Sequence, residues 1–180
     1  MRTVAVLCVA PKSIYHMLPG VEAFDARRDA RTFSGGMPAV AHPPCRSWSV
    51  FTSHQARPAA GEAELGLWCA EQVRTCGGIL EQPAHSRLWS AAKLPPPGDM
   101  TDSSSWSLEI WQAWWGYPLK KATWLYFRGI DHSIVVPPLK LHPRGGDRRR
   151  EQAMSKNERS ATHPAFAEWL VDLARKSNVT

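Results

Sequence analysis

The sequence predicts a single α/β domain, in which a parallel or mostly parallel sheet carries helices on both faces. Short apolar, β-branched segments alternate along the chain with longer segments whose apolar residues recur at helical spacing. The chain has 180 residues, enough to bury a full core, and 43% of them are hydrophobic, which suits a folded globular protein. Alternating strands and helices favour parallel strands, because parallel neighbours need a crossover connection.

Three strands are expected in the first quarter of the chain. The first apolar run is continuous and β-branched, and Pro11 ends it. It lacks a small-residue cleavage site, so it is interpreted as a strand and not as a signal peptide. The strands are expected over residues 3–10, 21–24 and 38–41, with a short helix over 12–18.

The clearest helix is expected over residues 62–76. Its apolar residues recur at helical spacing, Glu62 and Glu64 favour its N-terminus, and Gly77 and Gly78 end it. The sequence then predicts a strand over 79–83, a helix over 105–115, a strand over 122–127 and a last helix over 164–176. The expected units are a core over residues 1–128, a basic irregular segment over 129–161 and a C-terminal helix over 162–180 that packs on the core.

Basic residues outnumber acidic ones by 22 to 16, a formal net charge of +6 that is compatible with DNA as a partner. The segment 140–150 holds five basic residues in eleven positions. It is either a solvated loop or an arm that contacts phosphates and releases counterions. On the second interpretation the contacts come from Arg144, Arg148, Arg149 and Arg150.

Other classes of protein are disfavoured by composition. No apolar run is long enough to cross a bilayer, so a cytoplasmic protein with no membrane partner is expected. The four cysteines show no C-x-x-C spacing, so neither a disulfide framework nor a metal site is expected.

Three chemically capable residues fall at or just past the ends of predicted strands: Asp25, Cys45 and Glu81. Ligands of parallel sheets sit outside the carboxyl ends of the strands. In "HPPCRSWS", residues 42–49, two prolines restrict the backbone and aim the Cys45 thiol, and Arg46 favours its thiolate. Cys45 is a core thiol, a metal ligand or a nucleophile; the setting favours a nucleophile or the remnant of one.

The stretch "AHPPCRSWS" resembles the catalytic loop of DNA cytosine-5 methyltransferases, in which Pro-Cys-Gln precedes a small residue, an aromatic residue and serine. Pro44 and Cys45 match this loop, and Arg46 replaces the glutamine. The stretch "GGILEQP" resembles the Glu-Asn-Val strand end of the family and places Glu81 and Gln82 on its glutamate and amide.

A third stretch, "KKATWLYF", resembles the family strand that follows a basic pair. The resemblance implies a Rossmann-like methyltransferase-type sheet in a single compact domain. It also implies that the Cys45 thiolate attacks C6 of a flipped cytosine, that Glu81 hydrogen-bonds N3 and the exocyclic amine, and that C5 takes a methyl group. S-adenosylmethionine would contact Asp25, Asp29 and Pro43, and DNA would contact Ser47, Trp48, Lys120, Lys121 and the four arginines of the basic arm.

The resemblance spans residues 3–128, with three departures, one of which is that the C-terminal Gly-Asn segment of the family is missing and "ATHPAFAEWLVDLAR" would supply an equivalent packing helix. The turn after the first strand has no glycine before Gly20, where the family has Phe-x-Gly-x-Gly. Only residues 128–161 stand in place of a large target-recognition domain, so specificity is slight or comes from a protein partner. Two alternatives stay open: a degenerate methyltransferase fold that binds nucleic acid or protein, as a phage or mobile-element accessory factor, and an unrelated α/β enzyme with a nucleophilic cysteine and His42, His54 or His85 as its base.

Overall fold

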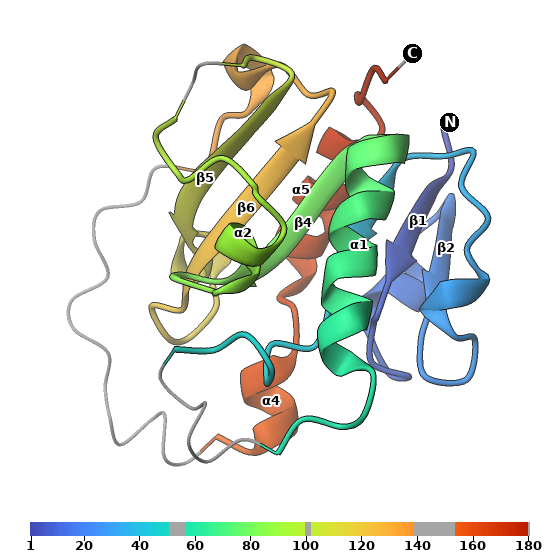
Figure 1. Cartoon of the computed structure of the whole chain (residues 1–180), viewed down its shortest axis with the longest axis vertical. Helices are drawn as coiled ribbons and strands as arrows, with labels where there is room; N and C mark the ends of the chain where they lie inside the picture. The colour runs from blue at the N-terminus through green and yellow to red at the C-terminus, as the bar shows by residue number, and fades with distance from the viewer. Residues whose placement is uncertain (51–56, 100–101, 139–153, 180) are drawn as a thin grey trace.

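The computed structural model describes residues 1–50, 57–99, 102–138 and 154–179, and it confirms the α/β class. Six strands form one mixed sheet in the order β2-β1-β3-β4-β6-β5 (Figure 1). The first four strands along the sheet are parallel, β6 is antiparallel to β4, and β5 is antiparallel to β6. The strands are β1 (Val4–Leu7), β2 (Val21–Phe24), β3 (Ala39–Ala41), β4 (Gly78–Pro83), β5 (Ser105–Trp111) and β6 (Ala122–Arg128).

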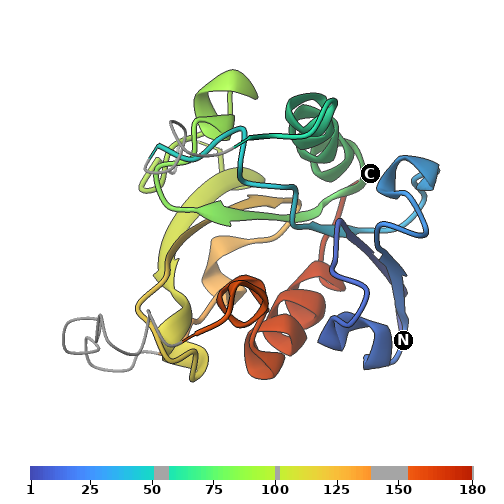
Figure 2. The ribbon, with the colours of Figure 1, turned by 90° about the horizontal axis from the view of Figure 1, so that it is seen from below.

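Helices cover both faces of the sheet, as Figure 2 shows. One face carries α1 (Glu62–Cys76), α2 (Leu88–Ala91) and the 3-10 helix η2 (Ala30–Thr32). The other carries α5 (Pro164–Ala174) and the 3-10 helices η1 (Ile14–Met17) and η3 (Gln112–Trp115). Successive strand residues alternate between the two faces, and both faces are covered, so the parallel strands β1 and β3 are apolar throughout.

The helix α1 has the bounds that the sequence predicts, because both of its ends are marked. Two acidic residues stand in its first turn, and Gly77 follows its last residue with a φ of 78°. Gly78 opens β4 with a φ of +120°, and a Cβ there would lie 2.8 Å from the backbone nitrogen and carbonyl carbon of Ala39. Glycine at this position lets β4 approach β3 closely.

The predicted helix over residues 105–115 is wrong. Residues Ser105–Trp111 form β5, an edge strand, and only Gln112–Trp115 turn into the 3-10 helix η3. Trp106 and Ile110 are buried on the α5 face, and Ser107 points to the other face, where its hydroxyl accepts a hydrogen bond from Trp89 Nε1 at 2.9 Å. The period is therefore two residues, which is the period of a strand.

The C-terminal helix α5 packs on the sheet and buries Phe166 and Leu170. The segment before it contains the 3-10 helix η4 (His132–Ile134) and the short helix α4 (Lys156–Ser160). The basic arm with Arg144, Arg148, Arg149 and Arg150 lies outside the described residues. Within the described ranges, no helix combines the length and apolar character that crossing a membrane requires.

Both chain ends lie at the amino edge of the parallel strands, at the top of Figure 1. The guanidinium of Arg2 donates to the carbonyl oxygen of Ser177, and Asn178 N donates to Gly129 O at 2.7 Å. The segment that follows β3, cyan in Figure 1, runs below the opposite edge of the sheet.

Candidate active site

The candidate site lies at the carboxyl edge of the parallel strands. The chain leaves β1 to form β2 on one side and returns to form β3 on the other, so β1 and β3 flank the switch point of the sheet. Ligands of open α/β sheets bind in the crevice outside such a point. The segment after β3 carries His42 and Cys45, and the neighbouring strand β4 carries Glu81.

Strand alternation places the polar side chains of this edge on one face. Val40, Ile79 and Leu125 belong to the core on the α5 face. His42 and Glu81 lie two residues after Val40 and Ile79. Thr123 lies two residues before Leu125, because β6 runs the other way, so all three are nearer the same edge of the sheet. Each of these strands therefore changes from apolar to polar on one and the same face as it reaches the edge.

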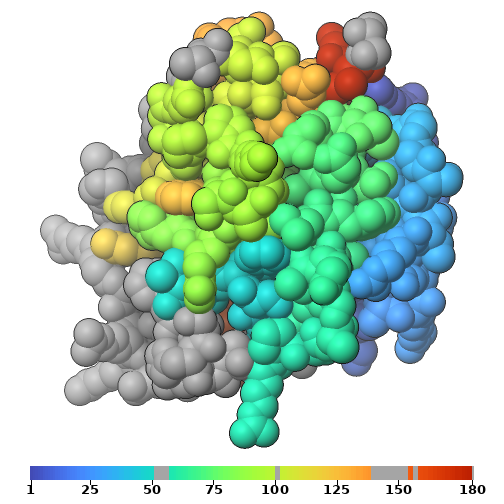
Figure 3. Space-filling view, in the orientation of Figure 1, coloured from blue at the N-terminus to red at the C-terminus, as the bar shows by residue number. Residues whose placement is uncertain are grey.

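The loop that carries Cys45 is fastened on three sides. His42 N donates to Leu7 O of β1 at 3.0 Å, and Gln82 Nε2 of β4 donates to Pro43 O. The backbone of Trp48 accepts from Arg87 N at 2.9 Å, and the loop is visible on the surface between α1 and the segment around α2 in Figure 3. Cys45 itself is exposed at the tip of this loop.

Glu81 holds the centre of a hydrogen-bond network in which both of its carboxylate oxygens have a partner. Its Oε2 lies 3.1 Å from His42 Nδ1, and its Oε1 accepts from Gln112 Nε2 at 2.9 Å. Gln112 Nε2 also lies 3.1 Å from Thr123 Oγ1. Only 12% of the Glu81 side chain is exposed, so these contacts replace most of its hydration.

The environment of Glu81 keeps it ionised. Burial raises the pKa of its carboxyl, but this effect is outweighed by the hydrogen bond and charge of His42, the charge of Lys121 and the hydrogen bond from Gln112. The net result is a lowered pKa, so Glu81 is a carboxylate at neutral pH and acts as an acceptor.

The environment of the Cys45 thiol has the opposite effect to that of Glu81, because it favours the protonated form. Surrounding protein atoms and then the negative charge of Glu81 raise its pKa above the ordinary value, and they outweigh Lys121 and Arg46, which lower it. Arg46 favours the thiolate, as the sequence predicts, but its guanidinium is paired with Glu62. At neutral pH the free protein therefore carries a protonated thiol at this position.

His42 does not serve as a base for Cys45 in this arrangement. Its Nδ1 faces Glu81, and its Nε2 lies 2.8 Å from the hydroxyl of Tyr15, so both ring nitrogens are engaged. Of the other two histidines that the sequence offers, His85 packs edge-on against Trp124, and His54 lies outside the described residues. The geometry thus disfavours a cysteine–histidine hydrolase built on His42.

The residues expected to hold S-adenosylmethionine are engaged with their own turns. Asp25 Oδ1 accepts from Arg27 N at 2.8 Å and Arg28 N at 3.0 Å, and these bonds lower the pKa of its carboxyl. Asp29 caps η2 by accepting from Arg31 N at 3.0 Å. Pro43 is buried, and the buried Tyr15 ring lies beside the ring of His42, with its centre 5.3 Å away. The role of these residues in binding S-adenosylmethionine, which the resemblance implies, stays a prediction.

The structure separates the residues expected to contact nucleic acid. Trp48 is 9% exposed and packs against Gly66 of α1, so it belongs to the core and has no free face for a base. The hydroxyl of Ser47 is buried, with no hydrogen-bond partner among the described residues. The ammonium of Lys120 lies 5.1 Å from the centre of the Trp111 ring, and both residues are half-buried.

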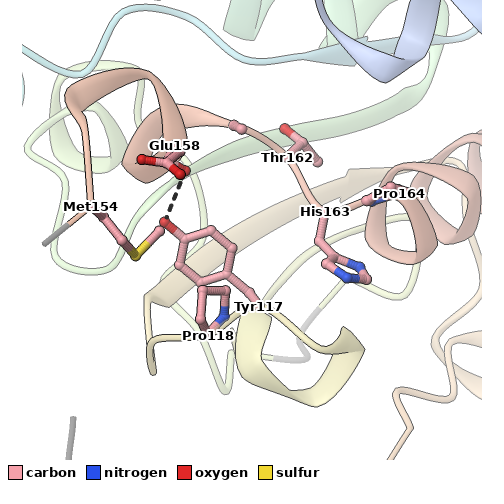
Figure 4. Close-up of a pocket in the computed structure, with 8 residues that line it drawn as sticks. Tyr117, Pro118, Met154, Glu158, Thr162, His163 and Pro164 are labelled. Carbon is pink, nitrogen blue, oxygen red and sulfur yellow. Dashed lines mark hydrogen bonds between the residues drawn. The ribbon is translucent and has the colours of Figure 1, made fainter. Parts of the chain in front are cut away.

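Lys121 is the basic residue that reaches the site. Its charge acts on both Glu81 and Cys45, and its ammonium lies 5.0 Å from the centre of the Tyr117 ring. The hydroxyl of Tyr117 donates to the backbone carbonyls of α4, as Figure 4 shows for Glu158. Tyr117 also lines a cavity of about 430 Å³ with Pro118, Met154, Glu158, Ala161, Thr162, His163 and Pro164.

Three members of the site were not singled out from the sequence: Tyr15, Gln112 and Thr123. Gln112 directly follows β5, so interpreting residues 105–111 as a strand would have placed it at a strand end. The site offers a thiol, an ionised carboxylate and an ammonium group within one electrostatic environment, which suits covalent addition to an electron-poor ring. The chain matches no family model, no curated protein and no solved structure.

Proposed function

We propose that the chain is a cytosine C5-modifying enzyme that acts on DNA through a covalent bond between Cys45 and C6 of the base. One observation carries the proposal: Cys45, from the loop after β3, and Glu81, from the neighbouring parallel strand β4, lie at the same edge of the sheet and interact electrostatically. The sequence resemblance assigns the nucleophile and the base-binding carboxylate to these two residues.

The hydrogen bonds of Glu81 support recognition of the cytosine edge. A carboxylate offers about four acceptor positions. His42 and Gln112 occupy one on each oxygen, so each oxygen retains room for one further donor. A cytosine protonated at N3 presents two adjacent donors, the N3–H and the exocyclic amine. The two remaining positions of Glu81 match that edge, and the base must leave the duplex to reach it.

The electrostatics of the site support activation of the thiol by the substrate. The charge of Glu81 holds the pKa of Cys45 up in the free protein. A base that donates two hydrogen bonds to Glu81 offsets that charge, and Lys121 then favours the thiolate. Cys45 is therefore reactive when the base is bound and protected as a thiol when it is not.

The methyl donor implied by the resemblance is S-adenosylmethionine. Calorimetric titration with S-adenosylmethionine tests this expectation, with an Asp25→Ala variant as control. Binding that the variant loses supports a methyltransferase with an unusual donor site. Absence of binding at millimolar ligand restricts the proposal to a different one-carbon electrophile at the same adduct.

The proposed function is tested by trapping the adduct on an oligonucleotide with 5-azacytosine at the target position. Nitrogen at position 5 makes C6 more electrophilic and takes a proton from water after attack, so the adduct accumulates without a donor. Mass spectrometry should show a single covalent adduct on Cys45 in the wild type and in Cys76→Ser, whose thiol is partly buried at the end of α1. The adduct should be absent from Cys45→Ala. No adduct, or one on another residue, refutes the proposal.

A second candidate is a nucleic-acid binding module without catalysis, as an accessory factor that itself contacts a protein partner. The net charge of +6 and the protonated thiol favour it. DNA affinity would then survive Cys45→Ala and fall steeply with salt concentration, because binding releases counterions. The adduct experiment separates the two functions.

A further inference from the structure

Tyr15, His42 and Glu81 form a continuous chain of hydrogen bonds that leads away from the proposed substrate. The Tyr15 hydroxyl lies 2.8 Å from His42 Nε2, and His42 Nδ1 lies 3.1 Å from Glu81 Oε2. Tyr15 is 1% exposed, and the side chains of His42 and Glu81 are each 12% exposed. The three residues come from η1, from the loop after β3 and from β4.

The chemistry of these groups fixes which atoms carry hydrogen. Glu81 is ionised and only accepts, so His42 Nδ1 carries the proton between them. Nε2 then either accepts from the Tyr15 hydroxyl, in neutral imidazole, or donates to its oxygen, in imidazolium. A hydroxyl can take both roles, so Tyr15 is a partner for His42 in both protonation states. Burial raises the pKa of Tyr15 strongly, which keeps the hydroxyl neutral.

Other polar groups also act on the hydrogen-bonded series of Tyr15, His42 and Glu81. Of the described residues, those that act on Glu81 besides His42 are Lys121, from the turn before β6, and Gln112, from η3. Cys45 feels the charge of Glu81 from the loop after β3. Gln112 carries no transferable proton of this kind, whereas the His42 imidazole has two ring nitrogens that each bind a proton, so His42 is the group in direct contact with Glu81 that is suited to pass one on.

We propose that His42 and Tyr15 are positioning residues that form a proton relay, through which Glu81 receives the proton it delivers to N3 of the base. The inference rests on the proposed function. In this proposal His42, which precedes the two prolines of the cysteine loop, both holds Glu81 by a hydrogen bond and supplies a proton to it.

Atoms and charges balance in the relay step. The Cys45 thiol loses its proton to water, and the sulfur forms a bond to C6. The C5=C6 electron pair becomes C4=C5, and the C4=N3 pair moves to N3. The ionised Glu81 takes the Nδ1 proton of the His42 imidazolium and passes a proton to N3, so that it is a carboxylate before and after the step. His42 becomes neutral imidazole with Nε2–H donated to Tyr15. When sulfur leaves C6 at the end of the reaction, the same proton returns by the reverse path.

The relay is tested by the pH dependence of adduct formation with the 5-azacytosine oligonucleotide, from about pH 5 to about pH 9. The wild type should give a bell-shaped profile, since the rate needs a deprotonated thiol and a protonated relay. Asparagine can donate to Glu81 from the place of Nδ1 but cannot carry a proton. His42→Asn should therefore lower the maximal rate about 100-fold and abolish the alkaline limb.

Two further variants sharpen the test. Tyr15→Phe removes the acceptor for Nε2–H of the imidazolium, so its alkaline limb should move to lower pH while the bell shape stays. His132→Asn alters a histidine of η4 that is exposed and faces Asp131, and it should match the wild type. Circular dichroism spectra and urea midpoints of each variant show that it is folded before its rates are compared.

The outcomes distinguish the relay from the proposed function. If His42→Asn keeps the wild-type rate and pH profile, a hydrogen bond is sufficient and the relay is refuted, while the proposed function stands. If the wild type forms no adduct, the proposed function fails. The relay then falls with it, because no base is present to take the proton from Glu81.

Discussion

Replacing Gly66 by alanine tests how the cysteine loop is held. Gly66 lies inside α1, and Trp48 of the loop rests on it: a Cβ at this position would overlap the indole nitrogen and lie 3.1 Å from Cε2 and 3.3 Å from Cδ1. Carbon atoms prefer a separation of about 3.5 Å or more, so the indole must retreat by at least about 0.4 Å. Trp48 is three residues from Cys45, so the displacement reaches the nucleophile.

Two opposing effects set the magnitude of the change in stability. Alanine in a helix interior is more favourable than glycine by about 1 kcal/mol. Overpacking a filled core costs about 1–3 kcal/mol. The difference is a loss of up to about 2 kcal/mol, and at about 2–4 °C per kcal/mol for a chain of this size, Tm should fall by up to about 8 °C.

The assay is urea unfolding followed by circular dichroism, in a double-variant cycle with Trp48→Phe. Phenylalanine lacks the indole nitrogen of Trp48, which in the wild type is buried and has no hydrogen-bond partner among the described residues. In that background Gly66→Ala should be neutral or stabilising by up to about 1 kcal/mol, because only the helix term remains. If Gly66→Ala costs the same in the wild type and in the Trp48→Phe background, the steric reasoning is refuted.

Three other predictions concern the site and the sheet. Glu81→Gln removes the charge that raises the pKa of Cys45, so iodoacetamide should alkylate Cys45 faster at neutral pH than in the wild type; a slower rate contradicts the electrostatic account. The lowered pKa of Glu81 means that its carboxylate stabilises the fold above its unfolded pKa of about 4.3 and that this stabilisation is lost as pH falls through the lower, folded pKa. Wild-type stability in urea should therefore fall more than that of Glu81→Gln as the solution is acidified through that interval, and parallel curves would contradict this. Thr123→Val removes the hydroxyl beside Gln112 that also donates to Lys121 O at 3.1 Å; it should cost about 1–3 kcal/mol in urea unfolding and slow adduct formation, whereas Ser90→Ala, at an exposed hydroxyl in α2, should change neither.

The elements whose ends are marked by local chemistry could be predicted from the sequence. The helix α1 begins at acidic residues and ends at a glycine pair, so its bounds agree with the prediction. Residues 105–115 are followed by Gly116, which favours a helix end, but no acidic residues mark a helix start at Ser105. Trp106 and Ile110 are four apart, which is compatible with a helix, and the aromatic run that follows obscures the alternation with Ser107 and Glu109. Local spacing alone does not distinguish the two periods over so short a window.

The candidate site could likewise be predicted only in part from the sequence. Cys45 and Glu81 were found because they stand at the ends of parallel strands, a rule that operates on the sequence. Gln112 reaches Glu81, and Thr123 contacts Gln112, through the antiparallel pairing of β6 with β4 and of β5 with β6, which the sequence does not specify. Trp48 was assigned to DNA because aromatic residues stack on bases, but the nearby Gly66 gives it a place in the core.

The position of the two chain ends has a practical consequence. Both lie at the amino edge of the sheet, where Arg2 contacts Ser177, and Cys45 and Glu81 lie at the carboxyl edge. A DNA-reading module attached to either end would sit on the far side of the sheet from the thiol. Targeting a fused module to a chosen sequence thus leaves the mouth of the site open, with reach governed by the length of the linker.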